Sequence, residues 1–118
     1  MRNFRKLNIW NDSIHLVTFV YELIKKLPDS EKLGLYSQLS RAVVSIPSNI
    51  AEGCAKDSQK DFARFLKISL GSSFEVETQI IICERLSYIS VQDSEIIIGK
   101  IHRLQKSINA LINYTKTQ

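Results

Sequence analysis

The chain has 118 residues, of which 44% are hydrophobic and 24% charged, so it is long enough to fold as one domain around a single core. Its four glycines and two prolines are too few for the many tight turns of an all-β fold, and long helices fit the composition better. Sixteen Lys and Arg against twelve Asp and Glu give a net charge of +4, which allows a polyanionic partner without requiring one.

The first apolar pattern predicts a helix over about residues 9–27, after a short basic arm that we expect to fray. Apolar residues in this segment recur at steps of four and three, which places them on one helical seam. They are Trp10, Ile14, Val17, Tyr21 and Ile24. Further apolar residues flank this seam, so we expect the wider face to cover a third helix or another subunit. The segment closes at Pro28.

The second pattern predicts a helix over residues 34–53. Its apolar face consists of Leu35, Leu39, Val43, Ile46 and Ile50. Pro47 interrupts this run and lacks the N–H that would bond to the carbonyl of Val43, at a cost of roughly 3 kcal/mol. We interpret the segment as one kinked helix, because the apolar period continues to Gly53, which is typical of a left-handed C-terminal cap. Two shorter helices are the alternative.

Polar side chains follow another side of the same helix with the same period. They are Gln38, Arg41, Ser45, Ser48, Asn49 and Glu52. Where such groups are buried they need hydrogen-bond partners, so we expect a polar network between helices or subunits that fixes their register. Direct contact with a ligand is the alternative interpretation.

Two more helices are predicted over residues 59–89 and 92–116. Ser58 and Ser90 stand where N-terminal caps belong, each followed three residues later by an aspartate. The middle of the third segment, around Gly71, is rich in small residues and suits close approach to the second helix. Four amphipathic helices with short connections predict an all-α fold, an antiparallel up-down-up-down four-helix bundle that forms a single domain over residues 1–118.

Basic residues form two groups that suit phosphate binding, which needs clustered cations. Lys60, Arg64 and Lys67 share one face of the third helix. On the fourth helix, Lys100, Arg103 and Lys106 are three residues apart and form a second stripe that turns gradually around the helix. The nucleic-acid-binding candidates are Arg41, Lys60, Arg64, Lys67, Lys100, Arg103 and Lys106. Base reading would need aromatic residues interleaved with these cations, and the sequence lacks them. An ordinary solvated face is the alternative.

Catalytic and metal-binding patterns are missing. His15 and His102 have no glutamate three residues before them, so a di-metal centre of the ferritin type is not expected. Cys54, placed in a loop after a helix C-terminus, lacks the positive dipole that activates a thiol. Glycine-rich phosphate loops are absent. We therefore expect no enzyme activity and no cofactor.

The glutamates at positions 52, 75 and 77 could act as acid-base groups, but we expect ion pairs within the bundle or between subunits. Arg41 and Arg64 are their candidate partners. The assembly residues are Ser45, Pro47, Asn49, Glu52, Gly53, Gly71 and Glu75. The longest apolar run is far shorter than the roughly 20 residues of a membrane span. Two cysteines without metal spacing predict reduced thiols and a cytoplasmic protein.

Three motifs in order resemble those of one family. They are Ser45 to Gly53 (SIPSNIAEG), Phe62 to Leu66 (FARFL), and Gly71-Ser72 followed by Glu75 and Glu77. The chain is similar over nearly its whole length to four helix bundle proteins, or 23S rRNA intervening-sequence proteins, which include the accessory variability determinant proteins of retroelements. This resemblance implies a four-helix bundle that assembles as a homopentamer. In the retroelement branch it further implies a basic assembly that associates with a reverse transcriptase and nucleic acid.

The sequence departs from the family pattern at two positions. Ser40-Arg41-Ala42 stands where many members have two arginines before the alanine, which removes a cation, and Ser69 stands where alanine is common. Taken together, the residues and the resemblance predict a non-enzymatic, self-assembling bundle that presents a basic surface to RNA or DNA phosphate. The alternative is a protein-interaction adaptor that docks a polymerase such as a reverse transcriptase.

Overall fold

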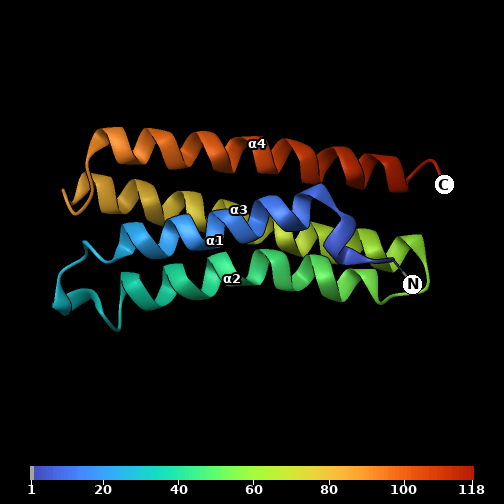
Figure 1. Ribbon diagram of the computed structural model, residues 1–118, viewed down its shortest axis with the longest axis horizontal. Helices are drawn as coiled ribbons and strands as arrows, with labels where there is room; N and C mark the ends of the chain where they lie inside the picture. Colours follow the sequence, from blue (N-terminus) through green and yellow to red (C-terminus); the bar gives the residue numbers. More distant parts are fainter. Residues whose placement is uncertain (1) are drawn as a thin grey trace.

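The structure, a computed structural model, describes residues 2–118 and contains four helices in an antiparallel bundle (Figure 1). The helices are α1 (Asn8–Ile24), α2 (Leu35–Cys54), α3 (Gln59–Arg85) and α4 (Val91–Thr115). Short 3-10 turns at Phe4–Lys6 and Asp29–Glu31 precede α1 and α2. The bundle measures 46 × 24 × 19 Å, and both chain termini lie at the end where α2 turns into α3. The predicted all-α, up-down-up-down fold is confirmed.

The N-terminal caps of α3 and α4 form as the sequence predicts. The side chain of Ser58 accepts a hydrogen bond from the backbone N–H of Asp61 at 3.0 Å, and Ser90 accepts one from Asp93 at the same distance. Each cap satisfies one of the N–H groups that a helix start leaves without a partner. Both helices therefore begin within one residue of the predicted position.

The C-terminal ends of α2 and α3 differ from the prediction. Gly53 does not adopt a left-handed conformation; it is buried inside α2, which continues to Cys54. Conversely, α3 ends at Arg85 rather than at 89, because Ser87 adopts the left-handed conformation with φ of 62°. The N–H groups of Ser87 and Tyr88 bond to carbonyls of Glu84 and Cys83, which is the Schellman pattern built without glycine.

The core confirms the predicted apolar face of α2 and part of the predicted face of α1. Leu39, Val43, Ile46 and Ile50 are fully buried, and Pro47 lies within one continuous helix, so the two-helix alternative is wrong. On α1 the predicted seam is only partly buried, since Ile24 is 1% exposed but Ile14 and Tyr21 are 36% and 38% exposed. The flanking row of the wide apolar face is the more deeply buried: Ile9, Ser13, Leu16, Val20 and Leu23.

Small residues do let α2 and α3 approach closely, although Gly71 is not among them. A Cβ added at Gly53 would lie 2.8 Å from the Cβ of Phe65, whereas one at Gly71 would meet nothing within 4 Å. Ser69 is fully buried and donates a hydrogen bond to the carbonyl of Ile46 at 3.0 Å. The serine at this position therefore bridges α2 and α3, which an alanine could not do.

Candidate nucleic-acid interface

Charge is distributed unevenly along the bundle. The half that contains the α2–α3 turn and both termini is rich in cations, and we call it the basic half. Its Lys and Arg residues are Arg2, Arg5, Lys6, Lys56, Lys60, Arg64, Lys67, Lys106 and Lys116. Its carboxylates are Asp12, Glu52, Asp57 and Asp61. The opposite half holds eight of the twelve carboxylates, so the net charge of +4 is concentrated at one end.

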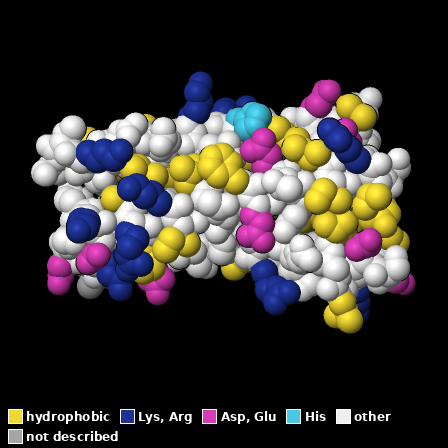
Figure 2. Space-filling view, turned by 180° about the vertical axis from the view of Figure 1, so that it is seen from behind, with side chains coloured by type: hydrophobic (Ala, Val, Ile, Leu, Met, Phe, Trp, Pro, Cys, Tyr) yellow, Lys and Arg dark blue, Asp and Glu magenta, His cyan; other side chains and the backbone are white. Residues whose placement is uncertain are grey.

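The stripe of Lys60, Arg64 and Lys67 lies on the outer side of α3 within this basic half, and all three residues are exposed. Figure 2 shows Lys and Arg side chains gathered towards one end of the face that α3 presents. Arg64 reaches Asp61 only at 4.0 Å, and no described carboxylate lies within that distance of Lys60 or Lys67. In the opposite half, Lys26 is instead paired with Asp93 at 2.6 Å. The α3 stripe is thus largely unneutralised.

Two aromatic rings lie beneath cations of the basic half. The guanidinium of Arg2 is 4.0 Å from the centre of the Phe62 ring, and Lys56 and Arg64 lie 5.1 and 4.6 Å from that of Phe65. Both rings are buried, with 2% and 9% of their surface exposed, so they cannot stack on bases. They help to hold the cations in place.

The N-terminal arm is anchored by Arg2. Its side chain donates hydrogen bonds to the carbonyl of Lys56 at 3.2 Å and to Oε1 of Gln59 at 2.7 Å. The backbone N–H of Arg2 also bonds to the carbonyl of Cys54. The expectation of a frayed arm is wrong for this residue, which adds a cation beside the α2–α3 turn. Only tertiary folding brings Arg2 and Lys56 together, so the local sequence pattern gave no signal for the pair.

The predicted basic stripe on α4 does not form one surface. Lys100 and Arg103 line a groove between α4 and α1, together with His15 of α1. Lys106 is exposed outside that groove. A step of three residues rotates about 60° around a helix, so two such steps carry the side chain to a different side.

The polar stripe of α2 joins α3 at some positions and faces outwards at others. The hydroxyl of Ser45 donates to that of Ser72 on α3 at 2.6 Å, and Gln79 of α3 lies 3.4 Å from Gln38. The amide of Asn49 bonds within its own helix, to the carbonyl of Ser45 at 2.8 Å. Part of the expected interhelical network is therefore present.

The outward part of the α2 stripe borders a shallow groove of about 480 Å³. Arg41, Ser48 and Glu52 line it, and Tyr21 of α1 forms one wall. Among the described residues, the carboxylates of Glu52 and Glu75 form no ion pair within 4.0 Å with the candidate partners Arg41 and Arg64. The expected ion pairs of these two glutamates are thus not made within the single chain.

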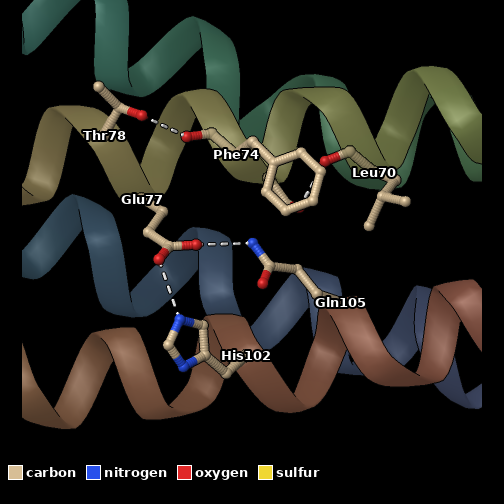
Figure 3. A network of polar contacts seen from close by, with 7 residues as sticks. Leu70, Phe74, Glu77, Thr78, His102 and Gln105 are labelled. Atoms are coloured by element: carbon tan, nitrogen blue, oxygen red, sulfur yellow. Dashed lines mark hydrogen bonds and ion pairs between the residues drawn. The ribbon is translucent and has the colours of Figure 1, made fainter.

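Glu77 is paired with side chains of another helix, α4 (Figure 3). Its carboxylate is 2.9 Å from Nε2 of His102 and accepts a hydrogen bond from the amide of Gln105 at 2.9 Å. Burial raises the pKa of Glu77, but the hydrogen bonds from His102 and Gln105 and the charge of His102 outweigh burial and lower it below the ordinary value. The expected contact of Glu77 within the bundle is therefore present, but its partners are His102 and Gln105 of α4 and not Arg41 or Arg64.

The thiols and potential metal ligands form no reactive centre in the part of the chain that the structure describes. Cys54 and Cys83 are free and buried, and burial raises the pKa of both thiols, that of Cys83 to about 11. Cys54 is the last residue of α2 rather than a loop residue. Among residues 2–118 no three His, Cys, Asp or Glu side chains gather as a metal site, and no helix is both long and apolar enough to cross a membrane.

Comparison with known proteins identifies the family. The model of the 23S rRNA-intervening sequence protein family matches residues 5–110. The chain belongs to this family. A crystal structure of a protein of unknown function from the S23 ribosomal protein family of Bacteroides thetaiotaomicron is similar, with a TM-score of 0.81 and 26% identity. The similarity covers 88% of this chain and 97% of that one. Among curated proteins none matches this family member.

Proposed function

We propose that this 23S rRNA-intervening sequence protein is a non-enzymatic, self-assembling bundle whose basic half binds the phosphate backbone of RNA or DNA. The observation that carries the proposal is the exposed α3 stripe, in which Lys60 and Lys67 have no carboxylate within 4.0 Å among the described residues. Such cations displace the condensed counterions of a nucleic acid, and the released ions favour binding.

The contacts of the basic half favour backbone binding over base reading. Phosphate contacts position a protein on nucleic acid, whereas base contacts supply sequence preference. The rings of Phe62 and Phe65 are buried under cations and are not available to stack on bases. We therefore expect similar affinity for strands of different sequence.

The test is the fluorescence anisotropy of labelled RNA and DNA, measured against purified protein over a series of salt concentrations. Replacing Lys60, Arg64 and Lys67 together by Gln should weaken binding and reduce the log-log salt slope by about 2 on single strands. The matched control replaces Lys25, Lys32 and Arg85 by Gln, which removes the same charge from the opposite half. Equal losses in both triple variants, or no loss in the first, would refute the role of the α3 stripe.

The adaptor is a second candidate, favoured by the shallow groove on α2. The small serine side chains that line the groove would let the backbone of another helix approach α2 closely. Tyr21 and Val44 beside them are 38% and 39% exposed. This surface suits a helix of another subunit or of a polymerase such as a reverse transcriptase. Our proposal includes a homopentamer built through it. Two free buried thiols fit a reducing compartment, and a cytoplasmic location is part of the proposal.

The assembly surface is tested by replacing Asn49 with Leu, since Asn49 lines the groove without contributing to the core. The variant should change the oligomer mass in light scattering after size-exclusion chromatography. Unchanged mass and unchanged thermal stability would remove this residue from the assembly. The adaptor itself predicts that one protein partner is recovered from native cells even after nuclease treatment.

A further inference from the structure

The groove between α1 and α4 has the size of a small-molecule site. Its volume is about 540 Å³, within the range typical of ligand pockets. The half-buried Phe19 supplies apolar surface at one end, and Leu16 and Leu104, each only 3% exposed, close the base of the groove. This apolar surface distinguishes the groove from the open α3 stripe.

Two cations lie at the Phe19 end. The ammonium group of Lys100 is 5.2 Å from the centre of the Phe19 ring, and Arg103 follows one turn later. A guanidinium nitrogen of Arg103 lies 3.7 Å from the position that a Cβ would take at Gly99, so the Arg103 side chain extends back towards Lys100 and the Phe19 end. No carboxylate of the described chain is within 4.0 Å of either cation. An arginine fork beside a lysine suits the oxygens of a phosphate.

The other end of the groove has different chemistry. Asp12 precedes Phe19 by seven residues on α1, and Ser107 follows Lys100 by seven on the antiparallel α4. Because Lys100 lies against Phe19, Asp12 and Ser107 lie together about 10 Å away, at a rise of 1.5 Å per residue. A carboxylate accepts hydrogen bonds and repels phosphate, so this end suits a neutral group with hydroxyl or N–H donors.

We propose that the α1–α4 groove binds a nucleotide. Its phosphate lies on Lys100 and Arg103, its base packs beside Phe19 over the floor that Leu16 and Leu104 close, and its donors reach Asp12. A bare phosphate would leave the apolar surface and the carboxylate unused. A free nucleotide and an unpaired nucleotide in an RNA strand share this chemistry. The site is separate from the α3 stripe and does not require that stripe to bind nucleic acid.

The test is isothermal titration of the full-length protein with AMP, and with inorganic phosphate and adenosine as partial probes. We expect saturable binding of AMP that is tighter than that of either fragment. Replacing both Lys100 and Arg103 by Gln should weaken AMP by about tenfold or more, since both charged hydrogen-bond donors are lost. The matched control, Lys32→Gln with Arg85→Gln, removes the same charge from exposed residues outside both the groove and the α3 stripe and should leave AMP affinity unchanged.

A second variant tests the shape of the groove without changing its charge. Ser107→Phe places a ring from an exposed position into the groove and should also weaken AMP, while circular dichroism and thermal melting check that the bundle is intact. A single-stranded RNA hexamer distinguishes the two sources of nucleotide. Binding of the hexamer alone, lost in the Lys100 and Arg103 variant but not in the control, supports the nucleotide in a strand; binding of AMP supports the free nucleotide.

The proposal is overturned if neither AMP nor the hexamer shows binding that depends on Lys100 and Arg103. It is also overturned if inorganic phosphate binds as tightly as AMP, because the apolar surface would then contribute nothing. Failure of the groove can be told from failure of the α3 stripe. In the first case the Lys60, Arg64 and Lys67 variant still weakens nucleic-acid binding, and in the second AMP still binds although that variant has no effect.

Discussion

Gly53 and Gly71 provide a direct test of how closely α2 and α3 pack. Both are helical, neither has a positive φ, and helix propensity alone predicts that replacing either by Ala stabilises the protein by up to about 1 kcal/mol. Their surroundings differ, since Gly53 is buried against α3 and Gly71 is exposed. We expect Gly53→Ala to destabilise the bundle and Gly71→Ala to stabilise it.

The magnitude follows from the contacts that a new methyl group would make. At Gly53 it would lie 2.8 Å from the Cβ of Phe65 and 3.3 Å from a ring carbon of Phe62. The Cβ of Phe65 is fixed to the backbone of α3, so the helices must separate, and overpacking of this kind costs typically about 1–3 kcal/mol. Subtracting the propensity gain leaves a net loss of about 1 kcal/mol. At Gly71 nothing offsets a gain of about 0.4–1 kcal/mol.

Thermal and urea unfolding of the two variants measure this difference. For a domain of this size 1 kcal/mol corresponds to a Tm shift of about 4 °C, so the two variants should move in opposite directions and differ by several degrees. An increase in Tm for Gly53→Ala equal to that for Gly71→Ala would refute the close approach at Phe65. A loss of stability for Gly71→Ala would show that another subunit packs against α3 at this position.

Two further predictions concern titratable groups. The pKa of Glu77 is lowered in the folded protein, so its stabilisation is present above the unfolded carboxyl pKa of about 4.3 and is lost as pH falls through the folded value. Urea unfolding should therefore show a smaller loss of stability on acidification in Glu77→Gln, and an identical pH profile would contradict the network with His102. Burial raises the pKa of Cys83 to about 11, so a disulfide reagent at pH 8 should modify it slowly in the native protein and rapidly in denaturant. Rapid native modification would contradict its burial.

Local signals determined which helix ends could be predicted. Ser58 and Ser90 cap their helices through one side chain and the N–H three residues later, so the sequence contains the whole interaction. The helix ends near Gly53 and Ser87 could not be predicted from local sequence. Glycine at position 53 is needed for contact with Phe65, and the left-handed residue that ends α3 is a serine. Glycine serves both close packing and left-handed turns, and the sequence around it does not distinguish them.

Which part of the wide apolar face of α1 is buried most deeply could not be predicted, because two neighbouring rows of this helix are both apolar. The row that faces the core includes Ser13, which is fully buried and donates to the carbonyl of Trp10, so it looked less hydrophobic than its neighbour. The other row places Ile14 and Tyr21 near the surface. Periodicity fixes the angle of each row on the helix, but only the positions of α2 and α4 decide which row is buried.

For the candidate phosphate-binding surfaces too, helical spacing shows which residues share a face but not what that face packs against. Spacing alone placed Lys60, Arg64 and Lys67 together because steps of four and three return to one side of a helix. The stripe on α4, with steps of three, divides between a groove and an outer face. Arg2 and Lys56 join the basic half only through the contact of the N-terminal arm with the α2–α3 turn. A helical pattern predicts a face; the neighbours of that face follow from the packed bundle.

The placement of the two surfaces determines how they can act together. Helices α1 and α3 are diagonal in the bundle, since each packs against α2 and α4 but not against the other (Figure 1). The α3 stripe faces outwards from one side, whereas the α1–α4 groove opens on another. One straight strand cannot lie along both surfaces of a single subunit. A strand held by α3 would therefore place its unpaired nucleotides in the groove either by bending around α4 or by reaching another copy of the chain. When one strand occupies both surfaces, each surface makes binding at the other intramolecular, so neutralising either one also removes that gain and the two losses of affinity are coupled.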